Sequence, residues 1–153
     1  MRADFLVSIT RRRRSGARGG RVIDVRHAVA MAFKLEHAFA GEVSVLLTDD
    51  QEIRALNHRF RGIDKPTDVL AFPTAAEHDA VAHRFWGDIV LSMERAKAQA
   101  RSRKVHWDLE IELLLVHGAL HLLGYDHLRV RDARCMRAAT RRIRTHLHRR
   151  ENR

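Results

Sequence analysis

Residues 108–127, DLEIELLLVHGALHLLGYDH, contain the most hydrophobic stretch of the chain. Residues 109–116 are apolar almost all round a helical projection, which is typical of a helix buried in a core. Asp108 is of a type that caps helix N-termini, and Gly124 is of the type that ends helices. The segment therefore predicts a central helix that runs from an Asp108 cap to about Leu123, with the other elements packed around it.

The segments on both sides of this helix predict further strands and helices. Apolar or alternating residues between turn signals predict strands at 5–9, 43–47, 69–72 and 86–91. Apolar side chains at helical spacing predict helices at about 22–39, 48–60, 92–104 and 130–146. Four strands interleaved with helices, without a linker or repeat, predict a single α/β or α+β layered domain over residues 1–153.

Residue types at the ends of these segments predict their boundaries. The run Thr48-Asp-Asp-Gln51 has the pattern of a capping box, with Thr48 as the cap. Ser92 is expected to cap the next helix along the chain. Residues 11–20, rich in Arg and Gly, predict a flexible basic loop, and a basic C-terminal tail is expected from about residue 147.

Composition is that of an ordinary globular protein. The 153 residues are 45% hydrophobic and 31% charged, with 8 Gly and 2 Pro, which excludes collagen-like and wholly disordered chains. The single cysteine, Cys135, excludes an internal disulfide and a Cys-rich zinc module. Neither a signal-like apolar stretch nor a run of about 18 apolar residues is present, so we expect a cytoplasmic protein without a membrane partner.

The net charge of +10 is concentrated at both ends of the sequence. Residues 1–26 hold eight Arg against two Asp, and residues 128–153 hold ten Arg against two acidic residues. A basic periphery attracts polyanions such as RNA, because phosphate neutralisation releases counterions. Of the 29 basic residues 25 are Arg, a skew that a GC-rich genome also produces without selection for binding. Charge alone leaves both interpretations open.

Three histidines in the central segment have the spacing of a metal site. His117 and His121 are four residues apart, so on a helix they project from one face with Cβ atoms about 5–6 Å apart. Gly124 can take the positive φ that turns the chain after the helix and brings His127 back toward the pair. Three neutral imidazoles with an open fourth position are the ligand set of a catalytic zinc. The alternative is an accidental pair, since the chain has 11 histidines.

One missing carboxylate bears on the chemistry. The spacing His-x3-His-x5-His also occurs in metzincin peptidases, whose helix carries a general-base Glu directly after the first histidine. Here that position is Gly118. Loss of a general base typically costs about 10²–10⁴-fold in rate, so peptide hydrolysis is disfavoured. A metal beside a basic surface favours a phosphodiester substrate instead.

Two further motifs accompany the histidine run, namely FRGIDKPTDVLAFP at residues 60–73 and GDIV at residues 87–90. In this order and spacing they and HGALHLLGYDH, residues 117–127, resemble the bacterial YbeY family of endoribonucleases. The resemblance implies a mixed sheet packed with helices, hence an α+β fold with four strands and a metal site at the end of the central helix. It also implies a zinc-dependent, single-strand-specific endoribonuclease that matures the 3′ end of small-subunit (16S) ribosomal RNA and acts in ribosome quality control.

Carried over to this chain, the resemblance assigns His117, His121 and His127 as ligands of one Zn²⁺ ion and Arg61 as the functionally important arginine. Taken alone, Arg61 is equally a charge that favours a helix C-terminus. Beside a metal, its planar fork can hold a scissile phosphate bidentately. Nickel, iron and copper also suit three imidazoles. The implied partners are single-stranded ribosomal RNA and the small ribosomal subunit, with no small-molecule cofactor.

Several carboxylates and one departure from the family pattern bear on this assignment. Asp126 is expected either to orient a ligand imidazole or to cap a turn, and Asp68 and Asp88 either to support the site or to satisfy turns. Ala71 replaces the serine of the family motif, and the segment after His127 is basic where the family is usually acid-rich. Two alternatives remain: a ribosome assembly or RNA-binding factor with a structural metal, and a metallopeptidase-like hydrolase.

Overall fold

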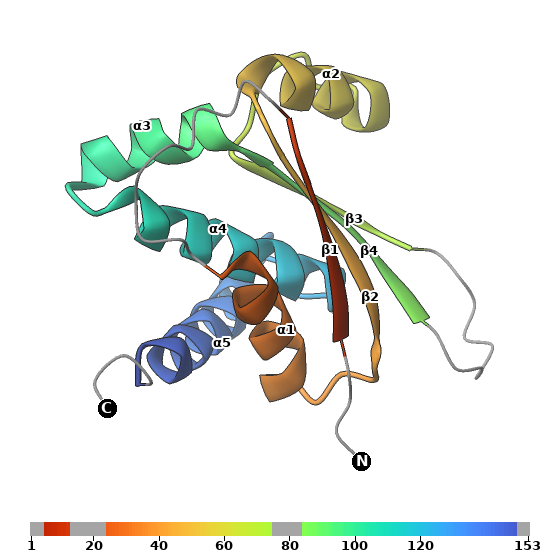
Figure 1. The fold of residues 1–153 in the computed structure, drawn as a ribbon, viewed down its shortest axis with the longest axis vertical. Coiled ribbons are helices and arrows are strands. Elements are labelled where there is room, and N and C mark those ends of the chain that lie inside the picture. Colours follow the sequence, from red (N-terminus) through yellow and green to blue (C-terminus); the bar gives the residue numbers. More distant parts are fainter. Residues whose placement is uncertain (1–4, 13–23, 75–83, 150–153) are drawn as a thin grey trace.

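The computed structural model describes residues 5–12, 24–74 and 84–149. Within these ranges the helices and strands follow one another along the chain in the order shown in Figure 1. They are β1 Phe5–Arg11, α1 Val25–Leu35, β2 Gly41–Thr48, α2 Asp50–Arg61, β3 Val69–Pro73, β4 Arg84–Ser92, α3 Met93–Arg103, α4 Trp107–Leu122 and α5 Val130–Arg149.

The strands form one mixed sheet in the order β1-β2-β4-β3. β1, β2 and β4 are parallel to one another, and β3 at the edge is antiparallel to β4. The α1 helix connects the parallel pair β1 and β2. The expectation of an α+β fold with a four-stranded mixed sheet is therefore confirmed.

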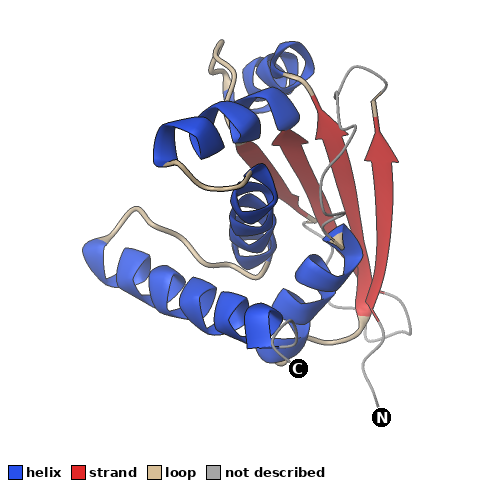
Figure 2. Cartoon of the chain, turned by 60° about the vertical axis from the view of Figure 1, so that its left-hand side comes forward, coloured by secondary structure: helices blue, strands red, loops and turns tan. Residues whose placement is uncertain are grey.

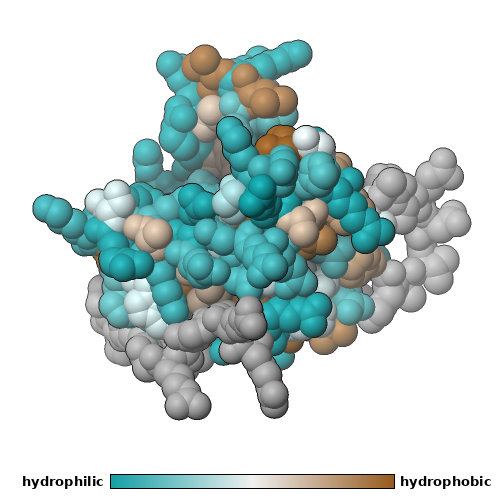
Figure 3. Space-filling model, turned by 90° about the horizontal axis from the view of Figure 1, so that it is seen from above, coloured by the Kyte–Doolittle hydropathy of each residue, from teal (hydrophilic) through white to brown (hydrophobic). Residues whose placement is uncertain are grey.

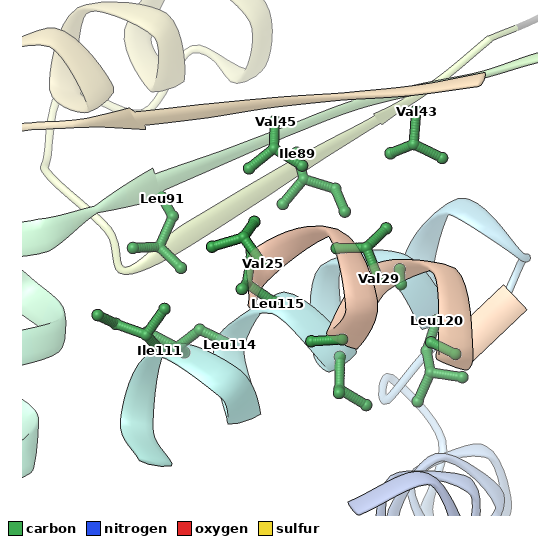
Figure 4. Packing of buried hydrophobic residues seen from close by; sticks show 14 of the residues in the cluster. Val25, Val29, Val43, Val45, Ile89, Leu91, Ile111, Leu114, Leu115 and Leu120 are labelled. Carbon is green, nitrogen blue, oxygen red and sulfur yellow. The ribbon is translucent and has the colours of Figure 1, made fainter. Parts of the chain in front are cut away.

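Alternation along the strands creates two differently covered faces of the sheet. Val43, Val45 and Ile89 point to the face on which α1 and α4 pack, and their side chains are fully buried (Figure 4). The intervening residues point to the other face, where Val90 packs with Ile53 of α2 in a smaller cluster. The main core thus lies between the sheet and the helices α1 and α4, with α5 completing its outer side.

The α4 helix lies at the centre of the molecule, as its sequence predicts. It contacts the sheet strands β3 and β4 as well as the helices α1, α3 and α5 (Figure 2). Most residues of α4 are buried, including the two carboxylates Glu110 and Glu112, which pair with Arg103 and Arg144 respectively. Because α4 is packed against the sheet and three helices, it fixes the direction of the side chains at its C-terminal end.

Two predicted helix starts, those of α3 and α2, are confirmed or corrected by the side chains that cap them. Ser92 caps α3 as expected, accepting a hydrogen bond from the Arg95 N–H at 3.2 Å. The cap of α2 is Asp49, whose carboxylate accepts from the Glu52 N–H at 2.9 Å. Thr48 was expected there but ends β2, where its hydroxyl bonds to the Glu52 carboxylate.

The central helix and α1 are also bounded differently from the prediction. α4 begins one residue before Asp108, because the His106 ring accepts from the Asp108 N–H at 3.3 Å and takes the capping role. α1 is shorter than the expected 22–39. Its cap is Asp24, and the chain leaves the helix after Leu35, where His37 has a positive φ of 56°.

The two expected basic segments are only partly described. Arg11 is the last residue of β1, so the predicted loop at 11–20 is wrong at its first position, and residues 13–20 lie outside the described ranges. The prediction of a tail from about residue 147 is wrong for residues 147–149. The α5 helix continues to Arg149, and Leu147 is buried against the core.

The surface seen in Figure 3 is predominantly hydrophilic, with separate hydrophobic spots rather than one continuous apolar area. No helix in the described ranges is both long and apolar enough to cross a bilayer.

Candidate active site

A cavity of about 880 Å³ opens where the C-terminal half of α4 meets β3, the end of α2 and the start of α5. The four residues predicted as the site, Arg61, His117, His121 and His127, all line it. They come from two separate parts of the chain, the end of α2 and residues 117–127, and the fold brings them to one concave surface. Such a shared cavity is the arrangement that a binding or catalytic site needs.

His117 and His121 project from one face of α4 into this cavity, both partly buried. Burial lowers the pKa of the His117 imidazole below its usual value, and the neighbouring His121 lowers it further. Burial likewise lowers the pKa of His121, against a hydrogen bond that raises it. Both rings are therefore held in the neutral form near pH 7, which is the form that binds metal ions.

A backbone carbonyl fixes the orientation of the His121 ring. Nδ1 of His121 lies 2.9 Å from the carbonyl oxygen of Tyr125. Since a carbonyl only accepts, Nδ1 carries the proton, and Nε2 keeps its lone pair directed away from the turn. Gly124, with a φ of 96°, makes this contact possible by turning the chain directly after α4. The prediction that Gly124 ends the helix is confirmed.

His127 follows this turn and lies beside His121. Their ring centroids are 5.3 Å apart, with the planes at 70° to each other. Two imidazoles on one tetrahedral zinc, with Zn–N bonds of about 2 Å, have centroids about 5 Å apart. The His121–His127 pair thus has the separation of two ligands of one ion.

Asp126 has the simpler of its two expected roles. Its carboxylate accepts from the His127 N–H at 2.6 Å and from the Leu128 N–H at 3.2 Å, so it caps the turn. The group that orients His121 is instead the Tyr125 carbonyl. Sequence reasoning missed it because a main-chain oxygen has no residue-type signal.

The donor set at this site fits a transition-metal ion, although its geometry is not closed. A neutral imidazole whose distal nitrogen is held by a carbonyl, as in His121, is a usual ligand of zinc. Within residues 5–12, 24–74 and 84–149, however, no three His, Cys, Asp or Glu side chains meet as a complete metal site. The assignment of His117, His121 and His127 as ligands accordingly stays a prediction.

Arg61 is the last residue of α2, and Gly62 follows it in the left-handed conformation with a φ of 70°. Its Nη2 donates to the Ala71 carbonyl oxygen at 3.3 Å, which holds the guanidinium against β3. The charge of Arg61 also lowers the pKa of His121, so the two groups interact across the cavity. Because the contact with residue 71 uses the main chain, the Ala71 side chain does not weaken it.

Asp68 lies at the cavity edge, and most of its hydrogen-bonding capacity is already used. One carboxylate oxygen accepts from the Val69 N–H at 2.7 Å, and the other accepts from Gln99 at 3.2 Å. These bonds fix the start of β3. Its negative charge also raises the pKa of His117, partly offsetting burial.

Gly118 lies where α4 approaches the sheet. A Cβ at this position would lie 2.7 Å from Cγ2 of Ile89. The absence of a glutamate after the first histidine therefore has a packing reason, because even a methyl group does not fit unless the Ile89 side chain shifts. The position of a metzincin general base is closed in this fold.

Comparisons with known proteins show the family to which the chain belongs. Residues 20–148 match the sequence model of the family named Endoribonuclease YbeY. The chain belongs to this family.

The relatives differ in how much of the chain they cover. An Endoribonuclease YbeY from Bradyrhizobium diazoefficiens is 42% identical over 129 residues, which are 80% of this chain and 70% of that protein. One from Persephonella marina is 49% identical over 88 residues, which are 58% of each chain. The solution structure of TM1509 from Thermotoga maritima matches with a TM-score of 0.57 and 25% identity, over 90% of this chain and 86% of that one.

In this member of the YbeY family, one wall of the cavity is formed by residues outside the three sequence motifs. Ala133, Met136 and Arg137 of α5 line it together with the histidines and Arg61. Sequence reasoning missed Arg137, because the direction of α5 after the turn depends on long-range packing. A signal was present in its spacing from the buried residues Met136 and Ala139, which places it beside the packed face of the helix.

Proposed function

We propose that this protein is a metal-dependent endoribonuclease that cleaves single-stranded RNA. Membership of the endoribonuclease YbeY family supports an RNA-cleaving hydrolase. The observation that carries the proposal is the single cavity in which Arg61 lies with His117, His121 and His127. Neutral imidazoles and a guanidinium are the groups expected where a metal-assisted reaction takes place at a phosphodiester.

The chain's own residues have separable parts in this proposal. His117, His121 and His127 would hold one Zn²⁺ ion, which supplies Lewis-acid stabilisation of the charge on a phosphoryl oxygen when bound. Tyr125 keeps the proton of His121 on Nδ1, so that Nε2 is the ligand atom. Arg61 binds the phosphate through its fork of N–H donors and stabilises the charge that develops during displacement.

The cellular role that we propose is maturation of the 3′ end of small-subunit (16S) ribosomal RNA and ribosome quality control, in the cytoplasm. It is supported by the family resemblance of the three motifs and by the basic character of the chain, which has a net charge of +10. A structural metal in an assembly factor is the alternative that the experiment below must separate.

The test combines RNA cleavage with metal analysis. We compare wild type with His121→Ala and Arg61→Ala. The matched histidine control is His58→Ala, on the exposed face of α2. Each protein is incubated with a labelled single-stranded 16S 3′ fragment and with its duplex. We expect His121→Ala to lose both bound metal and cleavage. Arg61→Ala should keep its metal but lose about 10²–10³-fold in kcat, since it removes a charge-stabilising donor.

Other outcomes contradict the proposal. Equal metal in wild type and His121→Ala would overturn the ligand assignment, and cleavage insensitive to a chelator would remove the metal from the reaction. Full ribosome assembly by both site variants would support the assembly factor instead.

A further inference from the structure

The α5 helix has one packed face and one strongly basic face. Its buried residues include Met136, Ile143 and Leu147, which face the core. The helix carries seven Arg and one Asp, and most of these arginines lie away from the core. Arg134, Arg137 and Arg141 are spaced i, i+3 and i+7, so they form one stripe along the helix. This set is called the α5 arginine stripe below.

The charge of the stripe is not neutralised by neighbouring carboxylates. Other arginines of α5 are paired, Arg142 with Glu36 and Arg144 with Glu112. Among the described residues, no carboxylate forms an ion pair with any member of the stripe. All three side chains are exposed. Three adjacent cations without partners create a local positive potential that attracts an extended anion.

The stripe is continuous with the candidate active site. Its middle member, Arg137, lines the same cavity as Arg61 and the three histidines. Arg134 and Arg141 flank Arg137 on the same face, and the three together span about 10 Å along the helix axis. A nucleic-acid strand carries one negative charge per phosphate. If one of its phosphates lies in the cavity, the neighbouring phosphates therefore lie near the α5 arginine stripe.

We propose that the α5 arginine stripe binds the phosphodiester backbone of the RNA strand whose scissile phosphate occupies the cavity. The inference rests on the proposed function and adds a binding surface to it. Guanidinium groups bind phosphate bidentately. The α5 helix has no Phe, Tyr or Trp on which a base could stack, so the contacts are to the backbone and are independent of base sequence.

The test measures binding without cleavage. The triple variant R134Q/R137Q/R141Q is compared with a matched control, R26Q/R101Q/K104Q, which removes the same charge from exposed positions at α1 and the end of α3. A fluorescent 20-nucleotide oligouridylate is titrated by anisotropy in EDTA at several salt concentrations. We expect the stripe variant to lose at least about tenfold in affinity, and its plot of log K against log salt to be shallower by about 2, whereas the control stays within about twofold of wild type.

The outcomes separate this inference from the proposed function. Equal losses in the two triple variants would show that net charge alone acts, and would overturn the stripe. The stripe proposal would also be wrong if wild type bound polyglutamate of the same charge as tightly as RNA and the stripe variant lost the same affinity for both. If wild type cleaves RNA while the stripe variant binds it normally, only the stripe falls. If wild type neither binds nor cleaves RNA, the proposed function falls as well.

Discussion

Gly118 illustrates how a single missing side chain disfavours a type of catalysis, here peptide hydrolysis with a glutamate as general base. It lies between the two α4 histidines, and an added Cβ would be 2.7 Å from Cγ2 and 3.3 Å from Cγ1 of Ile89. In an open helix, Gly→Ala stabilises by about 1 kcal/mol. Here the overlap should outweigh that gain, because a close-packed interior resists even one added methyl group.

We therefore expect Gly118→Ala to lower the free energy of unfolding by about 1–3 kcal/mol, measured by urea denaturation. The control is a double-mutant cycle with Ile89→Ala, which removes the side-chain atoms that the new Cβ meets. The two changes should be less destabilising together than the sum of the single variants. A more stable Gly118→Ala variant, or strict additivity, would contradict the packing explanation.

The residues of the site divide by how strongly the sequence determined their positions. The histidines of α4 were predictable, because a spacing of four on a helix fixes their common face regardless of the rest of the fold. Arg61 was predictable as a helix end, but its approach to His121 depends on the packing of α2 over β3. The Tyr125 carbonyl had no residue-type signal at all.

At the scale of elements, the turn after α4 is held by two other helices. The Tyr125 hydroxyl donates to the carboxylate of Glu36, at the end of α1, at a distance of 2.5 Å. The same carboxylate, 11% exposed, pairs with Arg142 of α5. The hydrogen bond from the Tyr125 hydroxyl to Glu36 raises the pKa of Tyr125. The Tyr125 carbonyl meanwhile orients His121, so Glu36 at the end of α1 and Arg142 of α5 support the site through the turn that carries Tyr125.

Removal of this hydroxyl should measurably loosen the turn. Tyr125→Phe leaves a mostly buried carboxylate without one of its donors, so the free energy of unfolding should fall by about 1–2 kcal/mol. Thermal and urea unfolding measure it, with Glu36→Gln as the partner in a double-mutant cycle. If Tyr125→Phe costs as much in the Glu36→Gln background as in wild type, the two residues are not coupled and this account is wrong.

Helix boundaries were less predictable than helix positions. Thr48 and Asp49 are both good capping residues, and local sequence does not separate them. The choice is made by β2, which extends to Thr48 through its pairing with β4, so that Asp49 is the first residue free to cap. The cap of α4 also differs from the expected one, because His106 takes the role expected of Asp108.

At the scale of the whole molecule, strand order and the path of α5 could not be predicted from local patterns. The order β1-β2-β4-β3 places β4 between β2 and β3, and that choice depends on contacts between distant segments. The path of α5 decides which arginine lines the cavity. The classification as an α+β fold with a mixed sheet required only the interleaving of segments and the resemblance of three motifs.

At the end of α5 the structure differs most directly from the prediction of a solvated tail. Leu147 is 8% exposed and belongs to the main core cluster, whereas Leu128, before α5 begins, is 84% exposed. If residues from 147 onward were a solvated tail, the two leucines would respond alike to truncation. Because the helix instead extends the core, Leu147→Ala should lower the free energy of unfolding by about 2 kcal/mol, near the low end for a buried leucine.

Leu128→Ala is the matched control and should stay within about 0.5 kcal/mol of wild type. Both are measured by urea unfolding, at equal m-values so that the denatured states are comparable. The destabilisation of α5 by Leu147→Ala should also affect the site, since Met136 and Arg137 of α5 form a wall of the cavity. Hydrogen exchange at these two amides should therefore quicken in Leu147→Ala and not in Leu128→Ala. Unchanged exchange with lowered stability would show that the last turn of α5 is bound to the core independently of the cavity wall.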